Sequence, residues 1–236
     1  MQVNKGFLMK SIVFLGLYFI SVICYANSII IDVGHNMKSS GATSAYGDSE
    51  FSYNRSFATH LQKSLSLQYD VKTVGLMGDA LSLSQRTVDS AYSDFFISIH
   101  HDSIQEQHLS HWVYNNKDLK YNDKIKGFSI FVSEKNINFK KSLHCAIVLG
   151  DNLVASGFTP NLYHALDIVG ERKKLYSKNA VYQYDNLVVL KSAKSPAILV
   201  EVGVLTNRQE AQEVLRPEFV DNFNNAIKNT LKICLK

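Results

Sequence analysis

The chain of 236 residues has few of the residues that mark special protein classes. With only 3 Cys it is not a scaffold built on disulfide bonds, and with only 3 Pro and 12 Gly it is neither collagen-like nor extensively disordered. The net charge is +4, and removing residues 1–26, which hold Lys5 and Lys10, leaves 23 basic and 21 acidic residues, or +2. Such a small charge does not indicate a nucleic-acid-binding protein. The length suits one domain with a sizeable core.

The N-terminal segment has the pattern of an export signal. Lys10 precedes the apolar run Ile12–Ile23, and the small residue Ala26 follows it. This run is shorter than the roughly 20 residues of a permanent transmembrane helix. We therefore expect a cleaved signal peptide over residues 1–26, with Met9 a better start than Met1, and a mature domain over residues 27–236 without a stable membrane span. A buried N-terminal helix or an uncleaved anchor is the alternative.

Cleavage at Ala26 would leave two cysteines, Cys145 and Cys234, in segments with helical periodicity. Cys234 continues the apolar face of the last helical segment. An oxidising compartment would allow a disulfide bond. The apolar surroundings favour two buried, unpaired thiols, and this is our prediction.

Short apolar runs alternate with amphipathic segments along the mature chain. The runs predict strands at Ser28–Val33, Val71–Val74, Phe95–Ile99, Gly127–Ser133, Asn186–Leu190 and Ala197–Val202. The amphipathic segments predict helices at Glu50–Leu67, Leu81–Tyr92, Lys140–Ser156 and Glu218–Ile233. Residues 102–126 are polar and predict a long loop of the kind that borders active sites. The order predicts a single α/β domain with a mostly parallel (mixed) sheet of about six strands and helices on both faces.

Ionisable residues lie where predicted strands end. His35 follows the first strand, His100 follows the third, and Glu201 is near the end of the last, while Glu50 starts a helix. Function in open α/β sheets collects beyond the carboxyl ends of the strands. Two histidines and one carboxylate are a common ligand set for catalytic zinc, and a further carboxylate can act as general base and acid. The spacing forms no compact motif, and a carboxylate at Glu50 also suits a helix N-terminus.

The residues around these positions add a resemblance. The segments IIIDVGHN, LSLSQR, DFFISIHHDS, YDNLVVLK and PAILVEVGVLTN start at residues 29, 81, 94, 184 and 196. In this order, with the helix start at Glu50, the chain from about Ser28 to its end resembles the zinc-dependent N-acetylmuramoyl-L-alanine amidases of the amidase 3 type. These are bacterial peptidoglycan hydrolases.

The resemblance implies a site and a reaction. It implies one Zn²⁺ per chain with His35, Glu50 and His100 as ligands, and Glu201 as the catalytic carboxylate. The substrate would be peptidoglycan, cleaved at the amide between N-acetylmuramic acid and L-alanine. The chain departs from the family at Asn36-Met37, often Gly-Gly, at His101, commonly a small residue, and at Val204, often an aromatic residue. These departures concern substrate fit and loop shape, more than the type of reaction.

Two other functions fit the same residues. A zinc peptidase that cuts within the stem peptides would use the same metal set, and a non-catalytic wall-binding protein would have the same fold. About ten residues separate the Gly127–Ser133 strand from the next helix, so we expect no helix that blocks the metal there. A cover formed by residues 102–126 and a need for a protein activator stay open. We expect an exported monomer, periplasmic rather than extracellular.

The other polar residues have simpler expected roles. His101 should support the neighbouring ligand or lie at the surface, because strand residues alternate in direction. Asp102 should orient a ligand histidine or bond the start of the loop, and Arg86 should form an ion pair or pack. Asn207 is an expected helix cap and Lys191 an expected solvated residue. The remaining histidines are expected to be structural or exposed: His60, His108, His111, His144 and His164.

Overall fold

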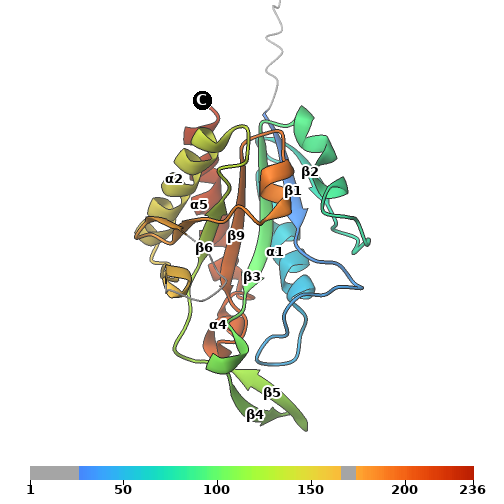
Figure 1. The fold of residues 1–236 in the computed structure, drawn as a ribbon, viewed down its shortest axis with the longest axis vertical. Coiled ribbons are helices and arrows are strands. Elements are labelled where there is room, and N and C mark those ends of the chain that lie inside the picture. Colours follow the sequence, from blue (N-terminus) through green and yellow to red (C-terminus); the bar gives the residue numbers. More distant parts are fainter. Residues whose placement is uncertain (1–26, 166–173) are drawn as a thin grey trace, which may run out of the picture.

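A computed structural model describes residues 27–165 and 174–236, so the expected signal peptide, residues 1–26, lies outside the described residues. The described chain forms a seven-stranded mixed sheet in the order β2-β1-β3-β9-β6-β8-β7, with helices on both faces (Figure 1). The predicted α/β architecture is confirmed, with seven strands in place of about six. The strands are β1 (Ser28–Val33), β2 (Asp70–Val74), β3 (Phe95–Asp102), β6 (Ser129–Val132), β7 (Lys174–Ser177), β8 (Val181–Gln183) and β9 (Ala197–Val204).

The centre of the sheet is parallel and buried on both faces. β1 pairs in parallel with β2 and β3, and β3 pairs in parallel with β9. The uninterrupted apolar runs of β1, β3 and β9 are typical of strands covered on both sides. β2 and β3 both follow β1 in sequence and lie on opposite sides of it in the sheet. The order in which strands are added to the sheet therefore reverses at β1. The carboxyl ends of β1 and β3 flank this switch point, where open α/β sheets bind ligands.

Helices cover the two faces unequally. On one face α1 (Glu50–Leu65) packs against α5 (Pro217–Cys234), which packs against α2 (Phe139–Ala155) (Figure 1). On the other face, within the part of the chain that the structure describes, lie the 3₁₀-helix η1 (Gln85–Tyr92) and the short α3 (Val188–Ser192). The 3₁₀-helix η3 (Tyr163–Ala165) follows α2 in the chain. The helix α4 (Arg208–Glu213) lies at the carboxyl end of β9. The second face is therefore the more open one near the strand ends.

The strand expected at Asn186–Leu190 is wrong, because Val188–Ser192 forms the helix α3. Its apolar residues Val189 and Leu190 are buried against the sheet. A short apolar run buries equally well as a strand or as one turn of helix, so periodicity does not distinguish them. The corresponding sheet positions belong to β8 and β7, which are too short to give a clear pattern.

The expected loop at 102–126 is also partly wrong. After the 3₁₀-helix η2 (Glu106–His108) it forms a hairpin of β4 (Ser110–Tyr114) and β5 (Lys117–Tyr121), which extends beyond the carboxyl end of β3 (Figure 1). Asn115 and Asn116 make the turn with positive φ angles of 49° and 59°, as asparagine does in two-residue hairpins. The indole Nε1 of Trp112 donates to the Ala45 carbonyl at 2.9 Å. The hairpin is thus tied to the segment before α1.

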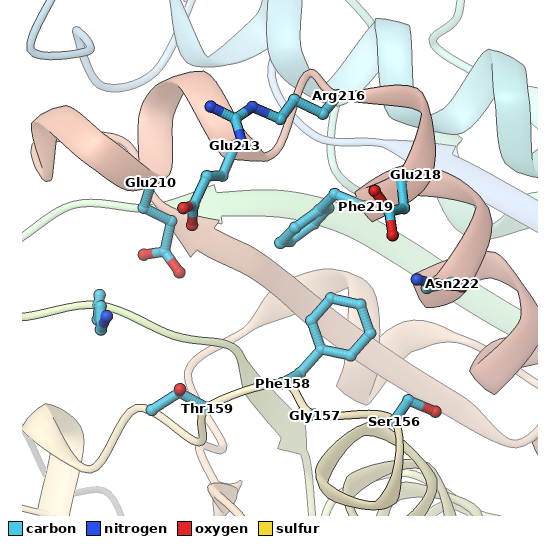
Figure 2. Close-up of a pocket in the computed structure, with 11 residues that line it drawn as sticks. Ser156, Gly157, Phe158, Thr159, Glu210, Glu213, Arg216, Glu218, Phe219 and Asn222 are labelled. Carbon is cyan, nitrogen blue, oxygen red and sulfur yellow. The ribbon is translucent and has the colours of Figure 1, made fainter.

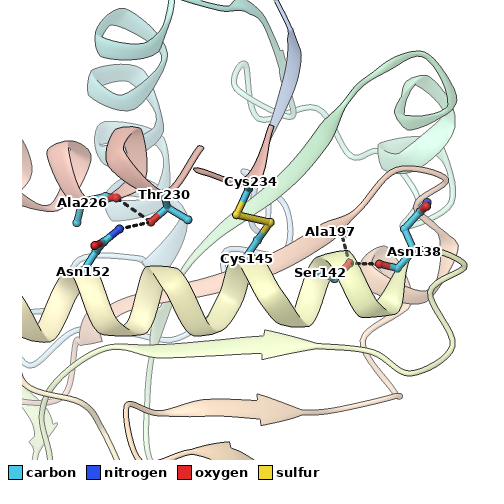
Figure 3. The surroundings of a disulfide bond; sticks show 8 residues. All are labelled: Asn138, Ser142, Cys145, Asn152, Ala197, Ala226, Thr230 and Cys234. Atoms are coloured by element: carbon cyan, nitrogen blue, oxygen red, sulfur yellow. Dashed lines mark hydrogen bonds between the residues drawn. A yellow bond between two sulfur atoms is a disulfide. The ribbon is translucent and has the colours of Figure 1, made fainter. Parts of the chain in front are cut away.

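Cys145 of α2 and Cys234 of α5 form a disulfide bond, so the prediction of unpaired thiols is wrong. Their Cα atoms lie 5.7 Å apart although 89 residues separate them in sequence. Figure 3 shows the bond joining the two helices, and nearby Asn152 of α2 donates to Thr230 Oγ1 of α5 at 2.9 Å. Only the packing of α2 on α5 brings the thiols within bonding range.

None of the helices within residues 27–165 and 174–236 combines the length and the apolar character required to cross a membrane.

Candidate active site

Three of the predicted site residues meet at the carboxyl end of the sheet. His35 follows β1, Glu50 is the first residue of α1, and His100 lies in β3. The Glu50 carboxylate contacts both histidines, with 2.9 Å from Oε2 to His35 Nε2 and 3.0 Å from Oε1 to His100 Nδ1. One ligand atom from each residue lies within 4.8 Å of the other two. Two imidazole nitrogens and one carboxylate oxygen at this spacing suit a divalent metal such as zinc.

The backbone of His35 is held in an uncommon conformation. Its φ angle is 65°, which a residue other than glycine rarely adopts. The buried guanidinium of Arg86 in η1 donates to the carbonyls of His35 and Val33, the latter at 2.6 Å, and pairs with Asp32 Oδ1 at 2.8 Å. Ser98 Oγ donates to the other oxygen of Asp32 at 2.6 Å. Arg86 is therefore an ion-pairing residue, as predicted, and it also fixes the main chain that carries His35.

Glu50 is buried, with 5% of its surface exposed, and its negative charge is well compensated. Burial alone would raise the pKa of Glu50, but hydrogen bonds with His100 and His35 and their charge lower it well below its usual range. The Ala42 amide donates to Oε2 at 3.0 Å, and the helix N-terminus favours a negative group. Glu50 is thus held as a carboxylate, the form that binds a metal.

Glu201 lies beside His100 on the neighbouring strand. The two residues are register partners of the parallel pair β3 and β9, so their side chains leave the same face of the sheet. β3 and β9 are buried along their whole length except at His100 and Glu201, which are partly exposed. Glu201 therefore lies next to the three clustered residues, partly exposed but with its carboxylate oxygen Oε2 buried.

A cavity of about 280 Å³ opens on this side of the sheet, and Glu201 is not among the residues that line it. His35 and His100 form part of its lining, and Leu81, Leu83, Leu187 and Val188 give it an apolar wall from the η1 and α3 side. The side chains of His35 and His100 are 31% and 18% exposed, so both can be reached from solvent. No residue of the 102–126 segment lines this cavity. Residues 133–138, between β6 and α2, form turns and no helix.

A second cavity of about 280 Å³ lies away from this cluster, between α4, α5 and the segment after α2 (Figure 2). Phe158 and Phe219 form its apolar base, and Glu210, Glu213 and Arg216 extend along one side. None of His35, Glu50, His100 or Glu201 lines it. Glu210 has a structural role there, because its carboxylate accepts from the amides of Gly127 at 2.9 Å and Val204 at 2.8 Å.

The two residues that follow His100 in the sequence, His101 and Asp102, contact different partners. His101 is buried on the opposite face of the sheet, where it bonds Asn54, so the expected supporting position is found and the surface position is not. Asp102 Oδ2 contacts His164 Nε2 at 2.5 Å and accepts from Asn161 at 3.2 Å, so it orients neither His35 nor His100. His164 is a buried structural residue.

The remaining expectations are confirmed where the structure describes them. Asn207 caps α4 by accepting from the Glu210 amide at 3.0 Å. Lys191 is exposed, although it lies in α3 and not near a strand end. The exposed histidines are His60, His108, His111 and His144.

Sequence analysis missed one residue of the site, Asn54. It is fully buried in α1, and its amide Nδ2 donates to Glu50 Oε1 and to the Gly34 carbonyl, both at 3.2 Å. In the sequence, Asn54 was only one of the residues with helical spacing in the predicted helix Glu50–Leu67. Its spacing of four residues from Glu50 was the available signal, because such residues are neighbours on one face of a helix.

Comparisons with known proteins show relatives in sequence and in fold. A provisionally named N-acetylmuramoyl-L-alanine amidase of Buchnera aphidicola is 28% identical over 232 residues, which cover 89% of this chain and 93% of that protein. The solved N-acetylmuramoyl-L-alanine amidase of Clostridium difficile 630 has a similar fold, with a TM-score of 0.68 and 21% identity over 90% of this chain and 98% of the other. An N-acetylmuramyl-L-alanine amidase of Mycobacterium smegmatis has a TM-score of 0.68 and 19% identity over 89% of this chain and 97% of the other.

The family comparison covers nearly the whole described domain. The amidase 3 family, described as N-acetylmuramoyl-L-alanine amidase, matches residues 29–232, a range that includes the three clustered residues and Glu201. Its members are zinc-dependent hydrolases of peptidoglycan, and the expected metal-binding side chains are present and in contact. By sequence and fold the chain belongs to the amidase 3 family of N-acetylmuramoyl-L-alanine amidases, as the resemblance had implied.

Proposed function

We propose that His35, Glu50 and His100 hold one zinc ion and that Glu201 is the general base and acid of the amidase reaction. The observation that carries this proposal is the contact of Glu50 with both histidines at 2.9 and 3.0 Å, with Glu201 as the register partner of His100. The donor set fits zinc, because imidazole nitrogen and carboxylate oxygen are its usual ligands in hydrolases.

A zinc ion at this position would polarise the scissile carbonyl, acidify a water molecule and stabilise the developing oxyanion. The residues of the chain have separate tasks around it. Glu201 accepts the proton of the attacking water and returns it to the leaving nitrogen of L-alanine. Glu50 stays ionised and keeps the two imidazoles oriented. The apolar wall at Leu83 and Val188 excludes water from one side of the substrate amide.

The family, the disulfide bond and the open cavity also favour an exported enzyme that is active without a partner protein. Family members act outside the cytoplasm, and a disulfide bond such as Cys145–Cys234 persists in oxidising compartments. We therefore assign residues 1–26 to a cleaved signal peptide and the mature monomer to the periplasm. The turns at residues 133–138 and the 102–126 hairpin leave the cavity open, which supports activity without a partner protein.

The test is mass spectrometry of purified sacculi digested by the mature chain, with and without a chelator. We expect intact stem peptides with a free L-alanine amino group, and no products after chelation. Shortened stem peptides still attached to muramic acid would instead identify a zinc peptidase. Bound zinc without products would contradict activity in the absence of a partner. Absence of both zinc and products would favour a wall-binding protein.

A further inference from the structure

His101 follows the proposed ligand His100 but points to the opposite face of β3. Only 2% of its surface is exposed, and its ring packs near Tyr53 and Phe57 of α1, with centroid distances of 5.6 and 6.2 Å. A buried imidazole carries two nitrogen atoms that require partners or lose their hydration. The partner of Nδ1 is Asn54 Oδ1, at 2.7 Å. This short contact is the only polar side-chain bond recorded for His101 in residues 27–165 and 174–236.

Asn54 bonds on its other side to the proposed metal site. Its second terminal atom lies 3.2 Å from Glu50 Oε1 and 3.2 Å from the Gly34 carbonyl, the residue before His35. A carboxylate and a carbonyl are both acceptors, so the atom that faces them must be the amide nitrogen. The amide oxygen of Asn54 then faces His101.

This orientation fixes the proton on His101. Oδ1 of Asn54 lies 2.7 Å from Nδ1 of His101, within hydrogen-bond distance. An amide oxygen accepts, so the proton of His101 is on Nδ1. The hydrogen bonds therefore run in one direction, from His101 Nδ1 to Asn54 Oδ1 and from Asn54 Nδ2 to Glu50 Oε1 and the Gly34 carbonyl.

We infer that His101 is a positioning residue for the metal site, because it locks the amide of Asn54 so that Asn54 holds the Glu50 carboxylate toward His35 and His100. The inference rests on the proposed zinc site. Without the donor at His101, the buried amide oxygen of Asn54 loses its partner, and the amide keeps only two of its three hydrogen bonds. The amide is then held less firmly, and its bond to the Glu50 carboxylate weakens.

The direct test compares two replacements in the full mature chain. His101→Leu keeps an apolar side chain of moderate size but has no donor, whereas His101→Asn places an amide nitrogen the same number of bonds from Cα as Nδ1. Zinc affinity is measured by competition with a chromophoric chelator. We expect His101→Leu to weaken zinc binding by about 10- to 100-fold, the usual effect of removing a residue that orients a ligand. His101→Asn should restore most of the affinity.

A control separates positioning from core packing. Ile97 is a buried residue of β3 four positions before His101, so its side chain lies on the same face of the sheet as His101. Ile97→Val removes one methylene group there and alters no polar contact of the site. It should lower the melting temperature and leave zinc affinity unchanged. In an Asn54→Ala background the change from His101 to leucine should have no further effect on zinc binding, because His101 acts through Asn54.

Several results would overturn the inference. Equal zinc affinity of the leucine and asparagine variants would show that the donor is irrelevant, and unchanged affinity in both would give His101 a packing role only. If neither variant folds, ¹⁵N NMR of the wild-type histidines decides, since a proton on Nε2 of His101 contradicts the bond direction. A wild-type chain that binds no zinc would instead disprove the proposed metal site itself.

Discussion

His100 and Glu201 are adjacent polar side chains in otherwise buried strands, yet their surroundings differ and favour different functions. His100 contacts Glu50 and belongs to the cluster of three ligands. Glu201 lies beside this cluster but is not one of the three side chains whose ligand atoms converge. Glu50 is fixed by its contacts with two histidines, as a metal ligand requires, whereas Glu201 is partly exposed. These surroundings support the proposed separation of a ligand, Glu50, from a base, Glu201.

This separation predicts opposite behaviour of two variants. Glu201→Gln should lower the turnover number by about 10²- to 10⁴-fold, the usual contribution of a general base, and should retain zinc. His35→Ala should lose both zinc and activity. Turnover of muropeptides and zinc content by elemental analysis are the measurements. Near-normal turnover of Glu201→Gln would contradict its role in the reaction.

Glu210 predicts a pH dependence of stability that is independent of catalysis. Burial raises its pKa from 4.5 to about 7, although amide donors partly oppose this. Between these values the folded chain binds more protons at Glu210 than the unfolded chain. The stability contributed by the protonated form is therefore complete below pH 4.5 and is lost as the pH rises through 7, by at most about 1.4 kcal/mol per pH unit.

The measurement is urea unfolding of the wild type and of Glu210→Gln between pH 5 and pH 8. Titrating groups common to both proteins, including the metal-site histidines, cancel in the difference. The advantage of the wild type over Glu210→Gln should shrink as the pH increases. A constant or growing advantage would show that the amides of Gly127 and Val204 keep Glu210 ionised.

Most of the candidate site residues could be predicted from the sequence. His35, His100 and Glu201 were selected because function collects at the carboxyl ends of strands, Glu50 was selected at the start of a helix, and the family resemblance implied their roles. The supporting residues could not be selected in this way. Asn54 is four residues from Glu50, but its contacts with Gly34 and His101 join segments that are distant in sequence. Only the folded backbone shows that Arg86 reaches the carbonyl of His35.

At the scale of elements, the disulfide bond links the two helices that complete the larger helical layer. α2 and α5 pack along each other, and the bond between Cys145 and Cys234 closes a long loop between them. Closing such a loop restricts the unfolded chain more than the folded one. The bond should therefore contribute to stability without affecting the metal site, which lies on β1, α1 and β3.

Replacement of both cysteines by alanine should lower the free energy of unfolding by about 2–5 kcal/mol. Zinc affinity and turnover at 25 °C should stay unchanged as long as the protein is folded. Denaturant unfolding, zinc titration and a turnover assay measure the three quantities. The wild type treated with a reductant is the matched comparison, and unchanged stability in both would show that the bond does not form in the protein.

Elements were predictable in proportion to their length and periodicity. α1, α2 and α5 were placed to within about two residues, which is the usual uncertainty of helix ends. α3 was mistaken for a strand, since its five residues form little more than one helical turn and show no repeated period. The β4–β5 hairpin was missed because its exposed residues interrupt the apolar pattern of a typical strand.

At the scale of the whole molecule, the proposed metal site is separate from the apolar core of the fold. The three proposed ligands contribute little to the buried apolar cluster between the sheet and α1, α2 and α5. We expect the chain to remain folded after removal of zinc, with lower stability. Free zinc at about 100 times its dissociation constant should raise the free energy of unfolding by about 2.7 kcal/mol.

Thermal unfolding with zinc and with a chelator tests this linkage, and circular dichroism at 25 °C shows whether the apo chain keeps its helices. Calcium is the control cation, because it prefers oxygen ligands and should not protect this site. Loss of helical signal on chelation would contradict a fold that is independent of the metal.

The fold class, the family and the four candidate site residues could be predicted from the sequence alone. These predictions follow from local features, namely apolar runs, helical periodicity and short motifs in a fixed order. The folded structure was required to find the disulfide bond, the path of residues 102–126, the bonds of Arg86 to the main chain at His35 and the contact of His101 with Asn54. Each depends on a distance between residues far apart in sequence, and such distances are set by how the helices and strands pack.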